Sequence, residues 1–216
     1  MTYRLTFAVA GRARFLSHLE TVDALLGALR RAGYQIALSK GMKPRPVISL
    51  ALPRAVGVQA QADLADVALV GEPDPAEVAG RLDAELPRGM TVVSVEPAEA
   101  GRRAAARVEA AEYEVEVEED VDWPAALGAF AAAEHVEVVR TAPGKADRTV
   151  DVRSYCSSIE HEPGVLRMEL RMTDSGTARP DEIAQAVAGL AGRTANIKRL
   201  VRTRIHLRPQ PVGART

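Results

Sequence analysis

The chain of 216 residues has few cysteines, few aromatic residues and no long apolar runs. Its single cysteine, Cys156, excludes an intrachain disulfide and an iron–sulfur cluster held by cysteines of this chain. No apolar run approaches the roughly 20 residues that span a bilayer, and the first residues alternate and then turn basic, unlike a signal peptide. We therefore expect a cytoplasmic protein with no membrane segment. Aromatic residues make up 4% and apolar residues 47% of the chain, so aliphatic side chains must form the core.

The first half of the chain alternates between strand and helix patterns. Tyr3–Val9 has the period of a half-buried strand. Ser17-His-Leu-Glu20 has the spacing of a capping box, and Gly33 is suitably placed to end the helix that follows. Asp74-Pro75 begins a second helix. Further strands are expected at 35–38, 47–52, 64–70 and 91–95.

The second half repeats this order of elements. An alternating strand at 113–117 is followed by a helix that begins at Asp122-Trp-Pro124, and a second helix begins near Pro180 with Ile183, Val187 and Leu190 on its apolar face. The other strands are expected at 136–140, 150–154, 165–172 and 200–207. Both halves have the order βαββαβ, which predicts an α+β fold of two tandem ferredoxin-like units, each an antiparallel sheet with helices on one face. The expected boundaries are unit one at 1–98, a linker at 99–110, unit two at 111–208 and a flexible tail at 209–216.

Charge is segregated along the chain. Residues 1–56 carry nine basic and two acidic groups (+7), and residues 57–122 carry five and seventeen (−12). Residues 123–192 carry seven and ten (−3), and residues 193–216 carry seven and none (+7). Alternate positions 112–118 are glutamates, and alternate positions 202–208 are basic. If the last strand pairs with the first strand of unit two, these faces form a cross-strand ladder of opposite charges. A ligand site at the C-terminal arginines is the alternative.

The N-terminal basic cluster has only Glu20 and Asp23 nearby in sequence. Its members are Arg12, Arg14, Arg30, Arg31, Lys40, Lys43, Arg45 and Arg54. Arg12 and Arg14 precede a helix whose first N–H groups favour an anion, and we expect the fold to bring Lys43 and Arg45 back to that end. RNA or another phosphate-rich partner is one interpretation. A solvated surface, or docking against the acidic middle of the same chain, is the other, because the sequence offers little aromatic surface on which bases could stack.

The candidates for catalysis are few. His18, next to the helix start, could act as an acid or base or simply bond locally. The histidines lack the spacing of a metal site, so neither a metal nor a cofactor is expected. Cys156 is expected at a strand end. The loop before Pro180 could hold an anion with help from Arg179, or it could be an ordinary turn that starts a helix.

Several of these loops resemble one bacterial family. Arg14-Phe-Leu-Ser-His-Leu19, Ser39-Lys-Gly41 with Pro44 and Pro46, Ser49-Leu-Ala-Leu-Pro53, and Gly176-Thr-Ala-Arg-Pro-Asp-Glu182 resemble the radical SAM-linked (radical SAM-associated) protein family, a bacterial domain of unknown function. The resemblance implies a partner of a radical SAM enzyme or RNA-processing system, and not a radical enzyme. Where relatives usually have Gly-Phe-Asn-Pro-His-Pro, this chain has Gly41-Met-Lys-Pro-Arg-Pro46, which lacks the histidine but adds two cations.

Three hypotheses follow from the sequence. The first is a non-catalytic binding or accessory module that uses a basic surface on unit one to bind RNA or a phosphate-rich partner. The second is an enzyme that acts on RNA or a phosphorylated substrate, with His18 as acid or base. The third is a scaffold whose acidic middle binds a basic protein. The candidate anion- or RNA-binding residues are Arg12, Arg14, Ser17, His18, Lys40, Lys43, Arg45 and Arg179.

Overall fold

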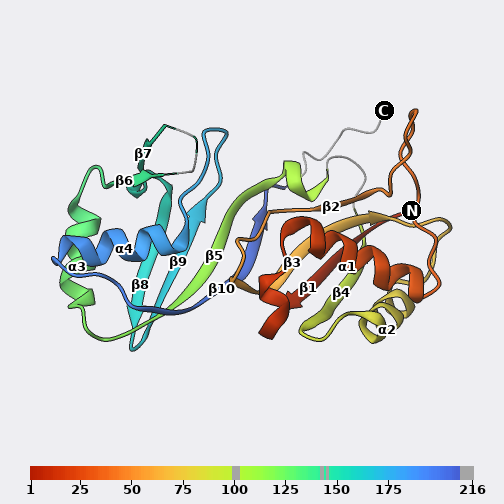
Figure 1. The fold of residues 1–216 in the computed structure, drawn as a ribbon, viewed down its shortest axis with the longest axis horizontal. Coiled ribbons are helices and arrows are strands. Elements are labelled where there is room, and N and C mark those ends of the chain that lie inside the picture. Colours follow the sequence, from red (N-terminus) through yellow and green to blue (C-terminus); the bar gives the residue numbers. More distant parts are fainter. Residues whose placement is uncertain (99–102, 142–143, 145, 210–216) are drawn as a thin grey trace. The chain divides into compact units, whose positions relative to one another are not determined.

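A mostly antiparallel sheet and four α-helices make up the regular part of the described chain, which is a mixed α+β fold (Figure 1). The structure is a computed structural model that describes residues 1–98, 103–141, 144 and 146–209. The chain divides into two units, here called unit 1 (Met1–Val108 with Arg204–Thr216) and unit 2 (Glu109–Thr203). The elements of unit 1 are β1 (Thr2–Val9), η1 (Gly11–Phe15), α1 (His18–Arg31), β2 (Ile48–Leu50), β3 (Gln59–Ala68), α2 (Pro75–Glu85), β4 (Met90–Pro97) and η2 (Ala104–Ala106).

In unit 1, β1 is paired with β4 on one side and β3 on the other, and β2 pairs with β3. The alternation predicted for β1 is confirmed, because Tyr3, Leu5, Phe7 and Val9 are all buried. Helices α1 and α2 cover one face of this sheet (Figure 1), and their apolar side chains join the same core. Burying a side chain of this size contributes about 1.5–3 kcal/mol, so this face provides most of the stability of the unit.

The helix starts of unit 1 follow the sequence signals closely. Ser17 accepts a hydrogen bond from the Glu20 N–H at 3.3 Å, and the Glu20 carboxylate accepts one from the Ser17 N–H at 2.8 Å, so the predicted capping box is confirmed. Asp74 caps α2 in front of Pro75. Gly33 ends α1 with a φ of 88°, a conformation that an L-residue rarely adopts.

Unit 2 is built around β5, which lies beside β9, with β8 at the outer edge of the sheet. Helices α3 and α4 pack against each other and bury Trp123, Phe130, Ile183 and Val187. A separate two-stranded hairpin, β6–β7, is inserted between α3 and β8. The elements are β5 (Val108–Val117), α3 (Trp123–Ala132), β6 (Glu137–Arg140), β7 (Arg148–Asp151), η3 (Arg153–Tyr155), β8 (Cys156–Glu162), β9 (Val165–Arg171), α4 (Pro180–Leu190) and β10 (Ile197–Leu207).

Three expectations about elements were wrong. The segment 35–38 is not a strand, and makes only isolated bridges from Ile36 to Leu69 and from Leu38 to Pro46. Strand β8 has no counterpart among the expected strands. Leu190 is 44% exposed and does not belong to the core.

Part of the expected linker at 99–110 is packed against unit 1. Ala104 is fully buried, and its N–H donates a 2.6 Å hydrogen bond to the Asp66 carboxylate, while β5 already begins at Val108. Residues 99–102 of that linker, and residues 210–216 of the expected tail, lie outside the described residues. No helix among the described residues has the length and apolarity to cross a membrane.

Candidate functional site

The eight candidate residues lie in three places. Four are next to the start of α1, three lie in the loop between α1 and β2, and Arg179 is the N-cap of α4 in unit 2. The first group comprises Arg12, Arg14, Ser17 and His18, and the second comprises Lys40, Lys43 and Arg45. The structure therefore does not bring the whole set together.

The two groups of unit 1 are at opposite ends of its sheet. Helix α1 begins just beyond Val9, the end of β1 that pairs with Ala60 and Met90. The loop with the lysines starts from the other end, where Thr2 pairs with Ala68 and the Ala37 N–H donates to the Ala68 carbonyl at 2.8 Å. Seven residue steps of strand separate these ends, which is about 23 Å. The expectation that Lys43 and Arg45 return to the helix start is therefore wrong.

The loop between α1 and β2 is an irregular two-stranded arm, here called the basic arm (Ile36–Ile48), which projects from the unit (Figure 1, orange). Its two sides are held together by hydrogen bonds from the Ser39 N–H to the Arg45 carbonyl (2.8 Å) and from the Val47 N–H to the Ala37 carbonyl (2.9 Å). Gly41, with a φ of 135°, allows the chain to reverse at the tip. The arm is thus tied along its length by its own backbone.

The cations of the basic arm are turned to solvent. Lys40, Lys43 and Arg45 are all exposed, and none of them forms an ion pair with a carboxylate of the described residues. One reason lies in the sequence, which has no acidic residue between Asp23 and Asp63. The apolar Met42 lies between the two lysines and is fully exposed. The tip therefore offers positive charge and one apolar side chain to a partner.

The start of α1 is different because it already holds a carboxylate. Hydrogen bonds from the Ser17 backbone and side chain hold the pKa of Glu20 below its ordinary value. The N–H groups that were expected to attract an anion are partly satisfied by this carboxylate, so the helix terminus by itself is a poorer anion site than the sequence indicated. Arg12 and His18 are exposed beside it, and the His18 side chain has no hydrogen-bond partner among the described residues.

Arg14 and Phe15 form a stacked pair at this end. The Arg14 guanidinium carbon lies 4.7 Å from the centroid of the Phe15 ring, which is 56% exposed. The Arg14 carbonyl accepts hydrogen bonds from Arg54 Nη1 (3.0 Å) and from the Gly57 N–H (2.9 Å). The loop that follows β2 therefore fixes the backbone that presents the pair.

Arg31 and Arg54 were expected to belong to an N-terminal cluster with no evident carboxylate partner. Both have such a partner in the structure, so the expectation was wrong for these two residues. Arg54 is buried, lies 3.4 Å from the Asp63 carboxylate, and donates to the Val58 carbonyl at 2.6 Å. Arg31 pairs with Glu85 at 2.9 Å. Both partners are distant in sequence, so only the fold could reveal them. Arg54 positions its neighbours and is not available to a ligand.

In unit 2, Arg179 lies at a helix start that is also occupied. Glu182 accepts a hydrogen bond from the Arg179 N–H at 2.9 Å and forms a two-bond ion pair with Arg140. That pairing, and above all its hydrogen bonds, raises the pKa of Arg140. The Arg179 side chain is 64% exposed and lies 3.8 Å from Glu182. An anion at this terminus would have to approach a carboxylate, which weakens the case for an anion site there.

The glutamate face predicted for β5 is confirmed, but the ion-pair partners of Glu114, Glu116 and Glu118 differ from those expected. Glu116 pairs with Arg199 at 3.0 Å and Glu118 with Lys198 at 3.6 Å, both on β10. Glu114 pairs instead with Arg167 of β9 at 3.1 Å. Glu116 and Glu118 thus neutralise part of the C-terminal basic block within unit 2. Their partners, Lys198 and Arg199, lie earlier in β10 than the basic residues of the expected ladder.

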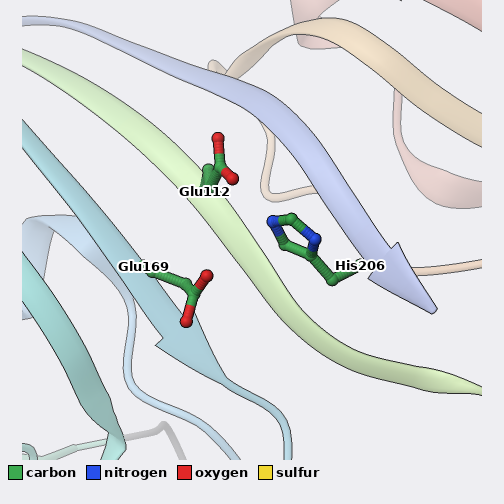
Figure 2. Close-up of side chains that lie close together, drawn as sticks. All are labelled: Glu112, Glu169 and His206. Atoms are coloured by element: carbon green, nitrogen blue, oxygen red, sulfur yellow. The ribbon is translucent and has the colours of Figure 1, made fainter. Parts of the chain in front are cut away.

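Two glutamates of this sheet lie directly opposite each other. Glu112 of β5 and Glu169 of β9 are register partners, and Figure 2 shows both side chains. Sequence spacing could not show this pairing, because the two residues come from different strands. Each also has interactions of its own with described residues, so we assign no ion to them.

A comparison with protein families identifies the chain. Residues 2–180 match the family described as "Uncharacterized protein conserved in bacteria (DUF2344)". The chain belongs to this family. No curated protein matches it.

Solved structures offer distant likenesses only. The chain is similar to a chain in a crystal structure of a Cbf5-Nop10-Gar1 complex (16% identity, TM-score 0.47) and to one in an H/ACA RNP bound to a substrate RNA containing 2′-deoxyuridine (15%, 0.47). The matches cover 93% of this chain but 48% and 47% of those chains, so this chain spans about half their length. It is also similar to an unknown protein from Galdieria sulphuraria (17% identity, TM-score 0.28, 93% and 97% covered). None of these likenesses bears on the activity of this chain.

Proposed function

We propose that the chain is a non-catalytic accessory module that binds RNA through the basic residues of unit 1. The observation that supports this most directly is the basic arm. It projects three solvent-exposed cations, none of them in an ion pair with a carboxylate of the described residues. An arm tied along its own backbone can bring these charges to a partner with little loss of chain entropy on binding.

A polyanion suits this arrangement better than a single anion. The arm has no set of convergent donors that would enclose one phosphate, whereas a nucleic-acid backbone offers a row of phosphates to cations spaced along a projection. Releasing counterions from that backbone makes such binding strongly dependent on salt. The second group, at the start of α1, adds Arg12 and Arg14 at the far end of the same unit.

The alternative is an enzyme that acts on RNA or a phosphorylated substrate with His18 as acid or base. His18 is exposed, which leaves it accessible to a substrate. No described side chain is hydrogen-bonded to it, so no second group orients the imidazole as a general base requires. The binding module is therefore the function that the geometry supports better.

Several finer assignments belong to the same proposal. The resemblance of the Arg14–Leu19 and Ser39–Pro46 segments supports a partnership with a radical SAM enzyme or an RNA-processing system. The strand orders β4-β1-β3-β2 and β10-β5-β9-β8 support two tandem ferredoxin-like units, which we place at 1–98 and 111–208. A single free, buried cysteine agrees with a cytoplasmic location.

The test of the proposed function is a salt series of RNA binding. Changing Lys40, Lys43 and Arg45 together to alanine removes the cations of the arm and leaves its backbone hydrogen bonds in place. We expect the affinity for a single-stranded oligoribonucleotide to fall at least roughly tenfold at low salt. The slope of log K against log salt should fall by about 2, from three contacts of about 0.7 each.

The matched control removes three exposed arginines of unit 2, Arg148, Arg171 and Arg193. It changes the net charge by the same amount and should leave most of the salt slope intact. If the control and the arm variant bind RNA equally well, the arm is not the binding surface. A His18→Ala variant with unchanged RNA binding but lost turnover of a bound RNA would favour the enzyme instead.

A further inference from the structure

We infer that Phe15 is a stacking platform for an unpaired base, which makes the start of α1 a subsite for single-stranded nucleic acid. This inference rests on the proposed function and specifies its ligand. It begins from an aromatic residue that is 56% exposed, whereas Tyr3, Phe7, Tyr113, Trp123 and Phe130 are buried and Tyr34 and Tyr155 are partly buried. The sequence indicated that no such platform existed.

The ring is held in place and is not a loose surface side chain. The Arg14 carbonyl accepts two hydrogen bonds, one from Arg54 Nη1 and one from the Gly57 N–H. Arg54 is itself buried beside Asp63. Gly57 lies against the ring, since a Cβ at that position would be 4.0 Å from Phe15 Cε1. A buried ion pair and a turn thus hold an apolar ring at the surface, which is the pre-organisation that stacking needs.

The groups around the ring match the chemistry of a nucleotide. The Arg14 guanidinium lies over the ring at 4.7 Å, so a planar cation is already part of the stack. Exposed Arg12 and His18 lie within three residues of Phe15 in sequence, and offer donors to phosphate or sugar oxygens. A flat aromatic base joined to a phosphate satisfies both the ring and the cations, whereas a purely apolar protein surface would leave the cations unsatisfied.

The nearest acidic group does not contradict this assignment. Glu20 lies in the first turn of α1, but its carboxylate turns back to the Ser17 N–H at 2.8 Å and is held by the capping box. Leu19, in the first turn of α1, is 71% exposed and adds apolar surface to the start of the helix without adding charge. Bases that are paired in a duplex cannot reach a ring in this way, so the subsite selects single strands.

The test uses the full chain and a single-stranded oligoribonucleotide of about 12 residues that carries one 2-aminopurine. Phe15→Leu keeps the apolar volume and removes the ring, Phe15→Tyr keeps the ring, and Leu19→Ala trims a neighbouring exposed apolar side chain. We expect Phe15→Leu to weaken binding about tenfold and to abolish quenching of the 2-aminopurine fluorescence. Phe15→Tyr and Leu19→Ala should bind and quench like the wild type, and binding of a matched duplex should not change.

The outcomes separate this inference from the proposed function. If Phe15→Leu quenched the 2-aminopurine fluorescence like the wild type, or if Leu19→Ala lost as much RNA affinity as Phe15→Leu, Phe15 would not be a stacking platform. Neither result would contradict RNA binding by the basic arm. The triple arm variant should show a smaller salt slope, lower by about 2, and should still quench the probe. A wild-type chain that binds no RNA at all would overturn both proposals.

Discussion

At the residue scale, Cys156 at the start of β8 is a buried free thiol. Its side chain is 3% exposed, and burial raises its pKa to about 11, although Arg153 and Arg171 partly oppose the shift. At pH 8 only about one thiol in a thousand is then ionised, and the thiolate is the reactive form. We expect native protein to react with a thiol reagent at least a hundredfold more slowly than protein unfolded in urea. Labelling at the rate of a free thiol would show that Cys156 is accessible.

Individual side chains were the hardest feature to predict from sequence. Phe15 and Arg54 show why. An aromatic residue between Arg14 and Leu16 gave no sign that its ring would be exposed, because the 3₁₀ turn η1 has neither helical nor strand periodicity. Arg54 looked like one more surface cation because its partner, Asp63, lies on β3 and meets it only after the chain has folded. Exposure and pairing are tertiary properties, and local pattern does not encode them.

At the element scale, Gly89, the residue before β4, packs closely against Ala10, the residue after β1. Its carbonyl accepts the Ala10 N–H at 2.7 Å, and a Cβ at this position would lie 2.6 Å from the Ala10 carbonyl oxygen. Its φ of 94° adds backbone strain for any other residue. Gly71, with a φ of 79° and open space around it, is the matched position.

Gly71→Ala should therefore lower the free energy of unfolding by about 1–2 kcal/mol, from strain alone. Gly89→Ala should lower it by roughly a further 1–3 kcal/mol, because the methyl group forces Ala10 and η1 to move. Urea unfolding followed by far-UV circular dichroism, which reports the helices and strands of both units, measures both changes. Equal losses in the two variants would mean that the close approach to Ala10 relaxes at little cost.

Helices and strands were predictable where a local sequence signal, such as a capping residue or alternating apolar residues, marks them. Capping at Ser17, Asp74 and Asp122 and the alternation of β1 and β5 all gave elements of the right type. Strand β8 could not be found this way, because it is a polar edge strand in which Ser and Glu dominate and only its first residue is buried. The first part of the basic arm, at 35–38, was expected to be a strand, but Leu38 is 60% exposed and the segment makes only isolated bridges.

At the scale of the whole chain, the charge pattern divides into neutralised and available parts. The C-terminal basic block is partly neutralised by Glu116 and Glu118. Arg31 and Arg54 are neutralised by carboxylates that follow them in sequence. What is left of the +7 charge on residues 1–56 is concentrated in the arm and at the start of α1. The count along the sequence predicted one basic cluster, and the structure places its exposed candidate cations in two groups at opposite ends of unit 1.

The stability of the folded chain should also depend on pH through carboxylates whose pKa the fold lowers, among them Glu20 in unit 1 and Glu119 in unit 2. Hydrogen bonds from Ser17 lower the pKa of Glu20 from its ordinary 4.5, and the Gly164 N–H, followed by His161, lowers that of Glu119. A carboxyl group whose folded pKa lies below its unfolded value contributes stability that is fully present above the unfolded pKa. That stability is lost as the pH falls through the folded pKa. Both contributions should therefore be complete at pH 7 and should disappear below about pH 4.5.

Glu20→Gln and Glu119→Gln test this dependence, since each keeps an oxygen acceptor and removes the charge. We expect each variant to unfold at lower urea than the wild type at pH 7, and to approach the wild type as the pH falls through the folded pKa of the native carboxyl group, below which that group is protonated too. Glu72→Gln is the control, because that side chain is exposed and forms no ion pair or hydrogen bond with the described residues, so its change should leave the urea midpoint unaltered at every pH. A constant difference between variant and wild type from pH 7 to pH 3 would mean that the charge of the carboxylate does not stabilise the fold, and that the amide simply packs less well.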